Sequence, residues 1–240
     1  MRYEFYYWPM IQGRGEFVRL ALEDAGADYV DVAREREANG LGITAMTRVM
    51  QDASAKHPPF APPFLRVGDQ FIAQTANILA YLGPRLGLVP ADEAGRTWAH
   101  QLQLTVTDFV KEAHDTHHPI ASSLYYEDQK PESLKRSADF LAVRLPKYFG
   151  YFQSVLDRNG GQWMVGEAVS HVDLSMFQIV AGMRYAFPKA MARQETTYAK
   201  LIALHDRVAG RPRLKAYLGS PRRIPFNEKG IFRRYPELDS

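Results

Sequence analysis

Residues 62–79 read PPFLRVGDQFIAQTANIL, and this stretch decides the fold class. Phe64 to Val67 and Gln70 to Ala73 have the composition of strands, and Gly68-Asp69 between them suits the two-residue turn of a tight hairpin. A helix is predicted to begin near Thr75, directly after the second strand. The stretch is therefore expected to form a β-β-α unit.

The residues before this unit alternate between strand and helix patterns. Strands are predicted over Tyr3 to Trp8 and Tyr29 to Val32, with a helix over Phe17 to Ala25 between them. Such an order favours a right-handed parallel β-α-β unit. Residues 33–57 are polar and irregular, with one possible helix over 43–50. Together with the β-β-α unit, these elements predict a first domain over residues 1–83.

The composition changes at GPRLGLVPAD, residues 83–92, whose glycines and prolines end the preceding helix and indicate a linker. Beyond it the apolar residues recur with helical spacing, which predicts an all-α domain over residues 92–240. The expected helices span 93–118, 131–156, 170–187 and 196–209, with a last short one after Pro212. Within the third, Ser170 to Asp173 (SHVD) have the spacing of a capping box.

The composition excludes several classes of chemistry. The 240 residues include no cysteine, so disulfides, iron–sulfur clusters and a cysteine nucleophile are absent, and any thiol must come from a substrate. The net charge is +3, but acidic residues are interleaved with basic ones, which argues against a nucleic-acid partner. We see neither an apolar run of about eighteen residues nor a signal peptide. We therefore expect a cytoplasmic protein with no membrane partner.

Two features near the hairpin could contact a ligand. Pro62-Pro63 precede a strand, where proline removes a backbone donor, so they form either a rigid loop or a ligand-contacting cis-proline turn. Thr75 is placed to cap a helix whose free N–H groups and positive dipole end would attract an anion. Gln74 could add amide contacts to an amino-acid-like ligand. The alternative for this pair is a plain helix cap.

Several motifs together resemble a known family. They are YWP followed by GR near the start, the proline before FLRVGDQ, QTANILAYLGPRLGL, VGEAVSHVDL, and GRPRLKAYLGSP near the end. Over nearly the whole chain, this set resembles cytosolic glutathione transferases and is most similar to the pi class. The resemblance implies a thioredoxin-like N-terminal domain, an all-α C-terminal domain, a homodimer, and detoxifying conjugation of the glutathione thiol to small hydrophobic electrophiles.

The family's catalytic tyrosine ends the first strand, and in the pi class an aromatic residue and a proline follow it. This pattern maps onto Tyr7-Trp8-Pro9 and implies Tyr7 as the catalytic residue. Counting back from GRGEFVR without a gap places Trp8 there instead, so one residue of PMIQ must be looped out. Because successive strand residues face opposite sides, Tyr6 is the alternative. Both tyrosines could also be structural.

The resemblance also implies the residues that would bind glutathione. Arg14 matches the arginine near the glycine carboxylate, although an arginine opening a helix can equally be solvated. Pro62 takes the position whose backbone N–H and C=O hold the cysteinyl part, and proline lacks the N–H. Glu112 matches the acidic residue that reaches across the dimer, with Asp108 as the alternative. The family's tryptophan and lysine after the second strand have no match here.

For the electrophile we name the flat aromatics Trp8, Tyr125 and Tyr126, whose alternative is ordinary core or surface packing. His114 and His118 lie four apart on a predicted helix, a metal-binding spacing, but no third ligand is evident and we predict no metal. The rival functions are a non-catalytic member of the same fold and a glutathione-dependent isomerase or peroxidase. The missing cysteine argues against relatives that use a cysteine nucleophile.

Overall fold

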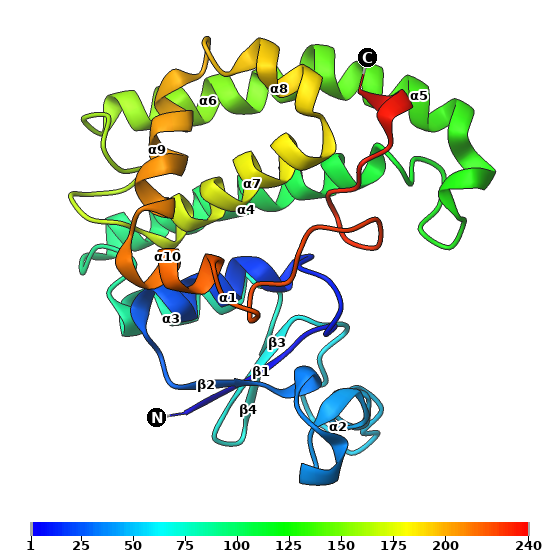
Figure 1. Cartoon of the computed structure of the whole chain (residues 1–240). Helices are drawn as coiled ribbons and strands as arrows, with labels where there is room; N and C mark the ends of the chain where they lie inside the picture. Colours follow the sequence, from blue (N-terminus) through cyan, green and yellow to red (C-terminus); the bar gives the residue numbers. More distant parts are fainter. Residues whose placement is uncertain (1, 240) are drawn as a thin grey trace.

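The computed structural model describes residues 2–239, so the outermost bounds of the two expected domains, residues 1 and 240, lie outside the described residues. It contains a four-stranded sheet with the order β2-β1-β3-β4 (Figure 1). Strand β1 (Tyr3–Tyr6) is parallel to β2 (Tyr29–Asp31) and antiparallel to β3 (Phe64–Val67), which forms the hairpin with β4 (Gln70–Ala73). The predicted β-α-β and β-β-α units are confirmed.

Strand β1 ends at Tyr6, two residues before the expected end at Trp8. The last register pair on its antiparallel side is Tyr6 with Phe64, the first residue of β3. Before Phe64 the chain is Pro62-Pro63, and proline has no N–H to extend a ladder. Tyr7 and Trp8 therefore lie beyond the sheet.

Helices cover both faces of the sheet. Helices α1 (Gly15–Ala25) and α3 (Thr75–Leu86) pack on one face, where Phe5 and Tyr7 join their buried side chains. Helix α2 (Gly42–Met50) covers the other face, where Tyr6 packs near Met46 (Figure 1). The possible helix over residues 43–50 is thus confirmed as α2. Alternate residues of β1 and the loop after it consequently serve opposite cores.

Helix α3 continues to Leu86, one turn beyond the expected stop at Gly83-Pro84. Gly83 does not end the helix but allows close packing, because a Cβ there would lie 3.0 Å from Val89 and 3.2 Å from His171. The helix ends at Gly87, whose φ of +68° gives the left-handed cap that glycine adopts without a steric cost.

The rest of the chain is helical, as expected. Its helices are α4 (Glu93–Asp115), α5 (Lys130–Asp139), α6 (Leu145–Arg158), α7 (His171–Ala186), α8 (Pro188–Gln194), α9 (Ala199–Ala209) and α10 (Pro212–Leu218). Short 3₁₀ turns occur at Val32–Arg34, Glu37–Asn39, Tyr126–Gln129 and Pro236–Leu238. Among residues 2–239, no helix is both long enough and apolar enough to cross a membrane.

The helix expected over residues 131–156 is interrupted by a π-helical turn, Phe140–Arg144. Pro146 follows this turn, and a proline inside a helix removes one backbone donor and displaces the preceding carbonyl. Helix α8 was not predicted. Helix α7 is buried along most of its length and contacts α1, α4 and α9, so the main core surrounds it.

Ser170 is the N-cap of helix α7, and Asp173 is its partner in the capping box that the SHVD spacing predicts. The Asp173 Oδ2 accepts hydrogen bonds from the backbone N–H and the hydroxyl of Ser170, each at 2.7 Å. Its Oδ1 accepts the backbone N–H of Met164 at 2.7 Å. Because the carboxyl group is fully buried, these three donors replace the water that it would otherwise bind.

A buried polar cluster joins α1 to the end of the chain, and we call it the α1 clasp: Glu16, Arg19, Tyr217 and Arg223. The Glu16 carboxylate accepts the Tyr217 hydroxyl at 2.7 Å and pairs with Arg223. Arg19 lies 3.5 Å from Glu16 and 2.7 Å from Asp31, with no exposed surface of its own. Ions buried this completely are tolerated only when they are paired. The clasp therefore fixes the sheet-containing part of the chain against the helical part.

Candidate glutathione site

The loop between β1 and α1 encloses Tyr7. A Cβ on Gly13 would overlap the Tyr7 hydroxyl, and a Cβ on Gly15 would overlap its ring, so only glycine fits at these two positions. The backbone N–H of Arg14, between them, donates to the Tyr7 hydroxyl oxygen at 2.8 Å. The Gly-Arg-Gly turn therefore exists in this form because the phenol lies directly beneath it.

The Tyr7 hydroxyl retains its proton. Burial raises the pKa of the phenol, and the nearby N–H groups of Arg14 and Gly15 only partly offset this increase. Within the described chain, no acceptor lies in hydrogen-bonding geometry with the hydroxyl proton of Tyr7. An oxygen that accepts from a backbone N–H and has no acceptor for its own proton is a preset hydrogen-bond donor. Tyr7 can thus donate to a ligand atom.

Tyr6 and Trp8 lie in different surroundings. Tyr6 stacks on Phe64 with ring centroids 4.6 Å apart and donates its hydroxyl proton to Glu4 at 2.6 Å. Burial and the Glu4 carboxylate both raise the pKa of Tyr6, so its hydroxyl stays protonated and hydrogen-bonded to Glu4. The alternative that Tyr6 is the donor finds no support in this geometry. Trp8 is 41% exposed and lies outside the core that holds Tyr7.

The start of α3 lies beside the Tyr7 loop. The peptide bond between Pro62 and Pro63 is cis, and Gln74 has φ of +70° and ψ of 122°, a conformation that a residue with a side chain rarely adopts. Such strain is typical of ligand sites. Thr75 is the first helical residue and not the cap as expected, and its hydroxyl lies 3.4 Å from the carbonyl oxygen of Arg14.

The first backbone N–H groups of helix α3 are available to a ligand, because no side chain within residues 2–239 caps them. A small cleft between this end of α3, α1 and α4 is lined by Arg14, Phe17, Thr75 and Thr107. The structure therefore brings together Tyr7, Arg14, Gln74 and Thr75, four of the predicted glutathione-site residues. The Tyr7 hydroxyl can therefore contact a thiol, and the start of α3 can bind an anion close by, because Arg14 contacts both Tyr7 and Thr75.

The two candidate carboxylates of α4 differ in their partners. Glu112 accepts hydrogen bonds from Arg144 at 2.6 Å, Tyr148 at 2.8 Å and Arg136 at 3.1 Å. The hydrogen bond with Arg144 is the main cause that lowers its pKa. Asp108 is exposed and has no hydrogen bond or ion pair to any described residue. Glu112 is therefore occupied within its own chain, and Asp108 is the carboxylate that remains available.

The two tyrosines expected at the electrophile side are also separated. Tyr125 is 78% exposed, whereas Tyr126 is buried. The Tyr126 ring stacks on Tyr235 at 3.8 Å and its hydroxyl donates to Glu237 at 2.9 Å. Tyr126 thus anchors the C-terminal segment, and its expected role as a wall of an open cleft is not supported.

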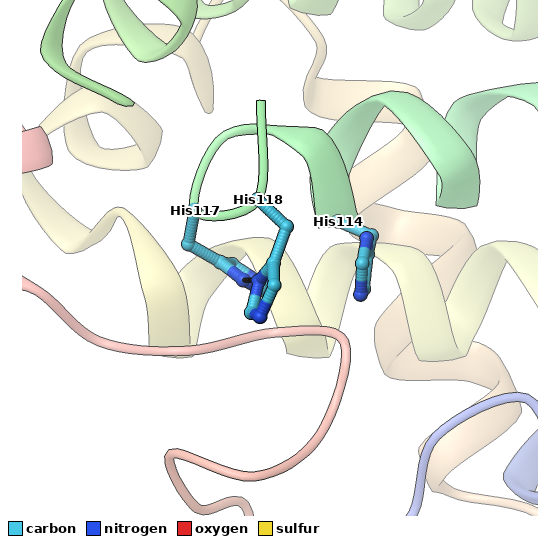
Figure 2. Close-up of side chains that lie close together, drawn as sticks. All are labelled: His114, His117 and His118. Atoms are coloured by element: carbon cyan, nitrogen blue, oxygen red, sulfur yellow. Dashed lines mark hydrogen bonds between the residues drawn. The ribbon is translucent and has the colours of Figure 1, made fainter. Parts of the chain in front are cut away.

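Three histidines gather where α4 ends. One ring nitrogen from each of His114, His117 and His118 lies within 4.8 Å of the other two (Figure 2). Sequence reasoning found the pair 114 and 118 but overlooked His117, although residues three apart on a helix share a face as residues four apart do. Helix α4 ends at Asp115, so His117 and His118 both lie just beyond it. Burial is the main cause that lowers the pKa of His114 to about 4, and the charges of His118 and of Arg14, which lies in the loop that encloses Tyr7, act in the same direction.

Known proteins match this chain over most of its length. Residues 114–221 match the family model "Glutathione S-transferase, C-terminal domain". The glutathione S-transferase P of Bos taurus is 27% identical over 238 residues, which cover 95% of this chain and 98% of that protein. The glutathione S-transferase of Plasmodium yoelii yoelii is 22% identical, covering 87% and 90%.

Solved structures agree with the fold. The prostaglandin synthase D of Nilaparvata lugens superposes with a TM-score of 0.70 at 22% identity, covering 94% of this chain and all of that one. The pi-class glutathione S-transferase of Onchocerca volvulus gives 0.69 at 22% identity, covering 91% and 92%. The fold is therefore the thioredoxin-like and all-α architecture that the motifs predict. Together with the family model over residues 114–221 and relatives that cover nearly the whole chain, it shows that the chain is similar to glutathione S-transferases along most of its length.

Proposed function

We propose that the protein is a transferase in which the Tyr7 hydroxyl activates the thiol of glutathione for conjugation to small hydrophobic electrophiles. The observation that carries the proposal is the preset Tyr7 donor, whose oxygen accepts from Arg14 and whose proton has no acceptor among the described residues. Relatives over nearly the whole length bear the name glutathione S-transferase, which supports the same reading.

The chemistry follows from hydrogen bonding to the charged form of the thiol. A free thiol has a pKa of about 8.5 and is mostly protonated at neutral pH. Donation from Tyr7 stabilises the thiolate and lowers that pKa, at about 1.4 kcal/mol per unit. The thiol proton leaves to solvent, and Tyr7 keeps its own. The thiolate sulfur donates an electron pair to an electrophilic carbon, and either a leaving group departs with its bonding pair or the pair of a π bond moves to the neighbouring atom, which then takes up a proton. Holding both reactants in place supplies the rest of the rate.

Glutathione would lie along the sheet-containing domain, residues 1–83. We place a carboxylate of glutathione near Arg14 and the free N–H groups at the start of α3, where the helix dipole favours an anion. Gln74 and Thr75 would contact the γ-glutamyl end. Pro62 would offer only its carbonyl to the cysteinyl part, because it has no N–H. Pro63 follows it in the cis bond.

The electrophile would bind against the helical domain, residues 92–240. Trp8 and Tyr125 are exposed aromatics that could cover an apolar substrate. We also propose a homodimer in which Asp108 meets the glutathione amine of the partner chain. Large apolar side chains exposed at Phe60, Leu104 and Val143 support an interface. We also propose a cytoplasmic location, as the similarity to glutathione transferases suggests.

The test is an ultraviolet difference titration of bound glutathione from pH 5 to 9, combined with conjugation assays on a panel of electrophiles. We expect thiolate absorbance near neutral pH and measurable conjugation. Binding with no thiolate and no conjugation would favour the non-catalytic member of the fold. A third outcome is thiolate formation with no conjugation of any panel member. If the protein then turns over a peroxide or an isomerisable substrate, the isomerase or peroxidase would be favoured.

A further inference from the structure

The histidine cluster at the end of α4 is composed of His114, His117 and His118. His117 is buried, and its Nε2 lies 2.7 Å from the carbonyl oxygen of Ile231. A carbonyl oxygen only accepts, so Nε2 carries the proton and Nδ1 of the neutral ring carries a free electron pair. This tautomer is fixed by a backbone partner, as metal-binding histidines in proteins generally are.

The free Nδ1 of His117 points at a second ring. It lies 2.6 Å from Nδ1 of His118, and the two rings are nearly perpendicular. In the absence of a cation, His118 donates one proton across this contact. If the proton of His118 moves to its Nε2, both Nδ1 atoms present electron pairs to the same point. A metal ion can then occupy the place of the shared proton.

His114 completes the group from one helical turn earlier. Its ring stacks on His118 with centroids 4.8 Å apart, and its buried Nδ1 lies 3.5 Å from Oδ1 of Asp115 without forming a well-oriented hydrogen bond. The neutral imidazole, with one unprotonated ring nitrogen, is the form that binds metals.

The ligand atoms of the cluster select the kind of ion, since all three are ring nitrogens. Asp115 lies 3.5 Å from His114 but is paired with Lys111, and Arg14 and Arg233 contribute positive charge that disfavours cations held by charge alone. Hard cations such as Mg²⁺ and Ca²⁺ need several oxygen ligands, which the cluster lacks. Borderline transition metals bind neutral imidazoles through the nitrogen electron pair.

We propose that His114, His117 and His118 form a binding site for a transition-metal ion of the Zn²⁺ class, with one coordination position left open for water. Three histidine ligands and an open fourth position are an established zinc geometry. Zn–N bonds of about 2.0–2.1 Å place ligand atoms roughly 3.3 Å apart in a tetrahedron. The three atoms now lie within 4.8 Å, so small side-chain rotations close the site.

The test uses the full chain without a histidine tag, stripped with a chelator. Co²⁺ is titrated while the visible spectrum is recorded, and Zn²⁺ and Mg²⁺ are then titrated by calorimetry. We expect one Co²⁺ per chain with the intense bands of tetrahedral coordination, displacement by Zn²⁺, and no heat from Mg²⁺. The proposal does not depend on transferase activity, which is not the readout.

Variants connect the binding to the cluster. His114→Asn and His118→Asn should each weaken Zn²⁺ binding at least tenfold, whereas His57→Asn, which removes an exposed histidine elsewhere, should leave it unchanged. His117 is left intact because its bond to Ile231 holds the C-terminal segment. Thermal unfolding checks that each variant is folded. No stoichiometric binding, or binding equally strong in both cluster variants, would overturn the site.

Discussion

The Arg14 N–H donates to the Tyr7 hydroxyl oxygen at 2.8 Å and holds the phenol beneath the loop after β1. Removal of that hydroxyl in Tyr7→Phe should raise the pKa of bound glutathione by about one unit or more, because each unit corresponds to about 1.4 kcal/mol. Conjugation at pH 6.5 should fall about tenfold or further. Tyr6→Phe is the matched control, and an equal loss in both variants would reject Tyr7 as the specific donor.

Replacing Pro62 should tighten glutathione binding. Pro62→Leu restores a backbone N–H at the position proposed to hold the cysteinyl part, and a new hydrogen bond typically contributes about 0.5–1.5 kcal/mol. The dissociation constant for glutathione should therefore fall about two- to tenfold, as measured by calorimetry. Pro58→Leu, in the same loop, is the control and should have no effect. Weaker binding in Pro62→Leu would place the cysteinyl part elsewhere.

The two carboxylates of α4 should behave differently when neutralised. Asp108→Asn should raise the KM for glutathione severalfold with unchanged stability, because Asp108 has no partner within the described chain. Glu112→Gln should instead lower the free energy of unfolding by about 1–3 kcal/mol, since it leaves the bidentate partner Arg144 uncompensated. Steady-state kinetics and urea unfolding measure the two effects, and an exchange of these outcomes would assign the binding role to Glu112.

Asp173 should make stability depend on pH. Burial raises its pKa to about 6 in the folded chain, despite three opposing hydrogen bonds, against about 3.9 when unfolded. The folded state then binds the proton more tightly, so the contribution of this group is largest below pH 4 and is lost as pH rises to about 6. The loss is on the order of 2–3 kcal/mol.

Urea unfolding of the wild type and Asp173→Asn at pH 4.5 and 6.5 isolates this contribution, because other titrating groups cancel in the difference. The wild type should lose stability relative to the variant as the pH rises. The variant should be less stable at both values, since an amide cannot accept all three hydrogen bonds. A difference that stays constant with pH would show that Asp173 has an ordinary pKa in the folded chain.

Phe60 offers a test of the proposed dimer. Its side chain is 94% exposed in the loop before Pro62, where it would otherwise contact only water. Phe60→Ser should shift the molecular mass measured by light scattering from dimer toward monomer at micromolar concentration. Ile43→Ser, at another exposed apolar position, is the control. A mass that is unchanged in Phe60→Ser would locate the interface elsewhere.

Local chemistry made much of the fold predictable. The hairpin turn, the capping box at Ser170 and the helical repeats depend on neighbours in the sequence, and the structure confirms them. The choice between Tyr6 and Tyr7 depends on where β1 stops, which is set by pairing with Phe64 far along the chain. The hydrogen bond between Glu112 and Arg144 joins residues 32 apart in the sequence, so no local sequence pattern predicts it. His117, in contrast, lies three residues after His114, a spacing that places two residues on one helix face, so the sequence contained a signal for the third histidine.

Because of the α1 clasp, the sheet-containing half of this chain depends on residues of the helical half. Glu16 belongs to the sheet-containing half, but Tyr217 and Arg223, which bind its carboxylate, come from near the end of the chain. A hybrid that joins this first half to the helical half of a relative would bury Glu16 with Arg19 as its only remaining partner. Exchange of halves between this chain and a relative therefore requires a helical half that supplies an equivalent tyrosine and arginine.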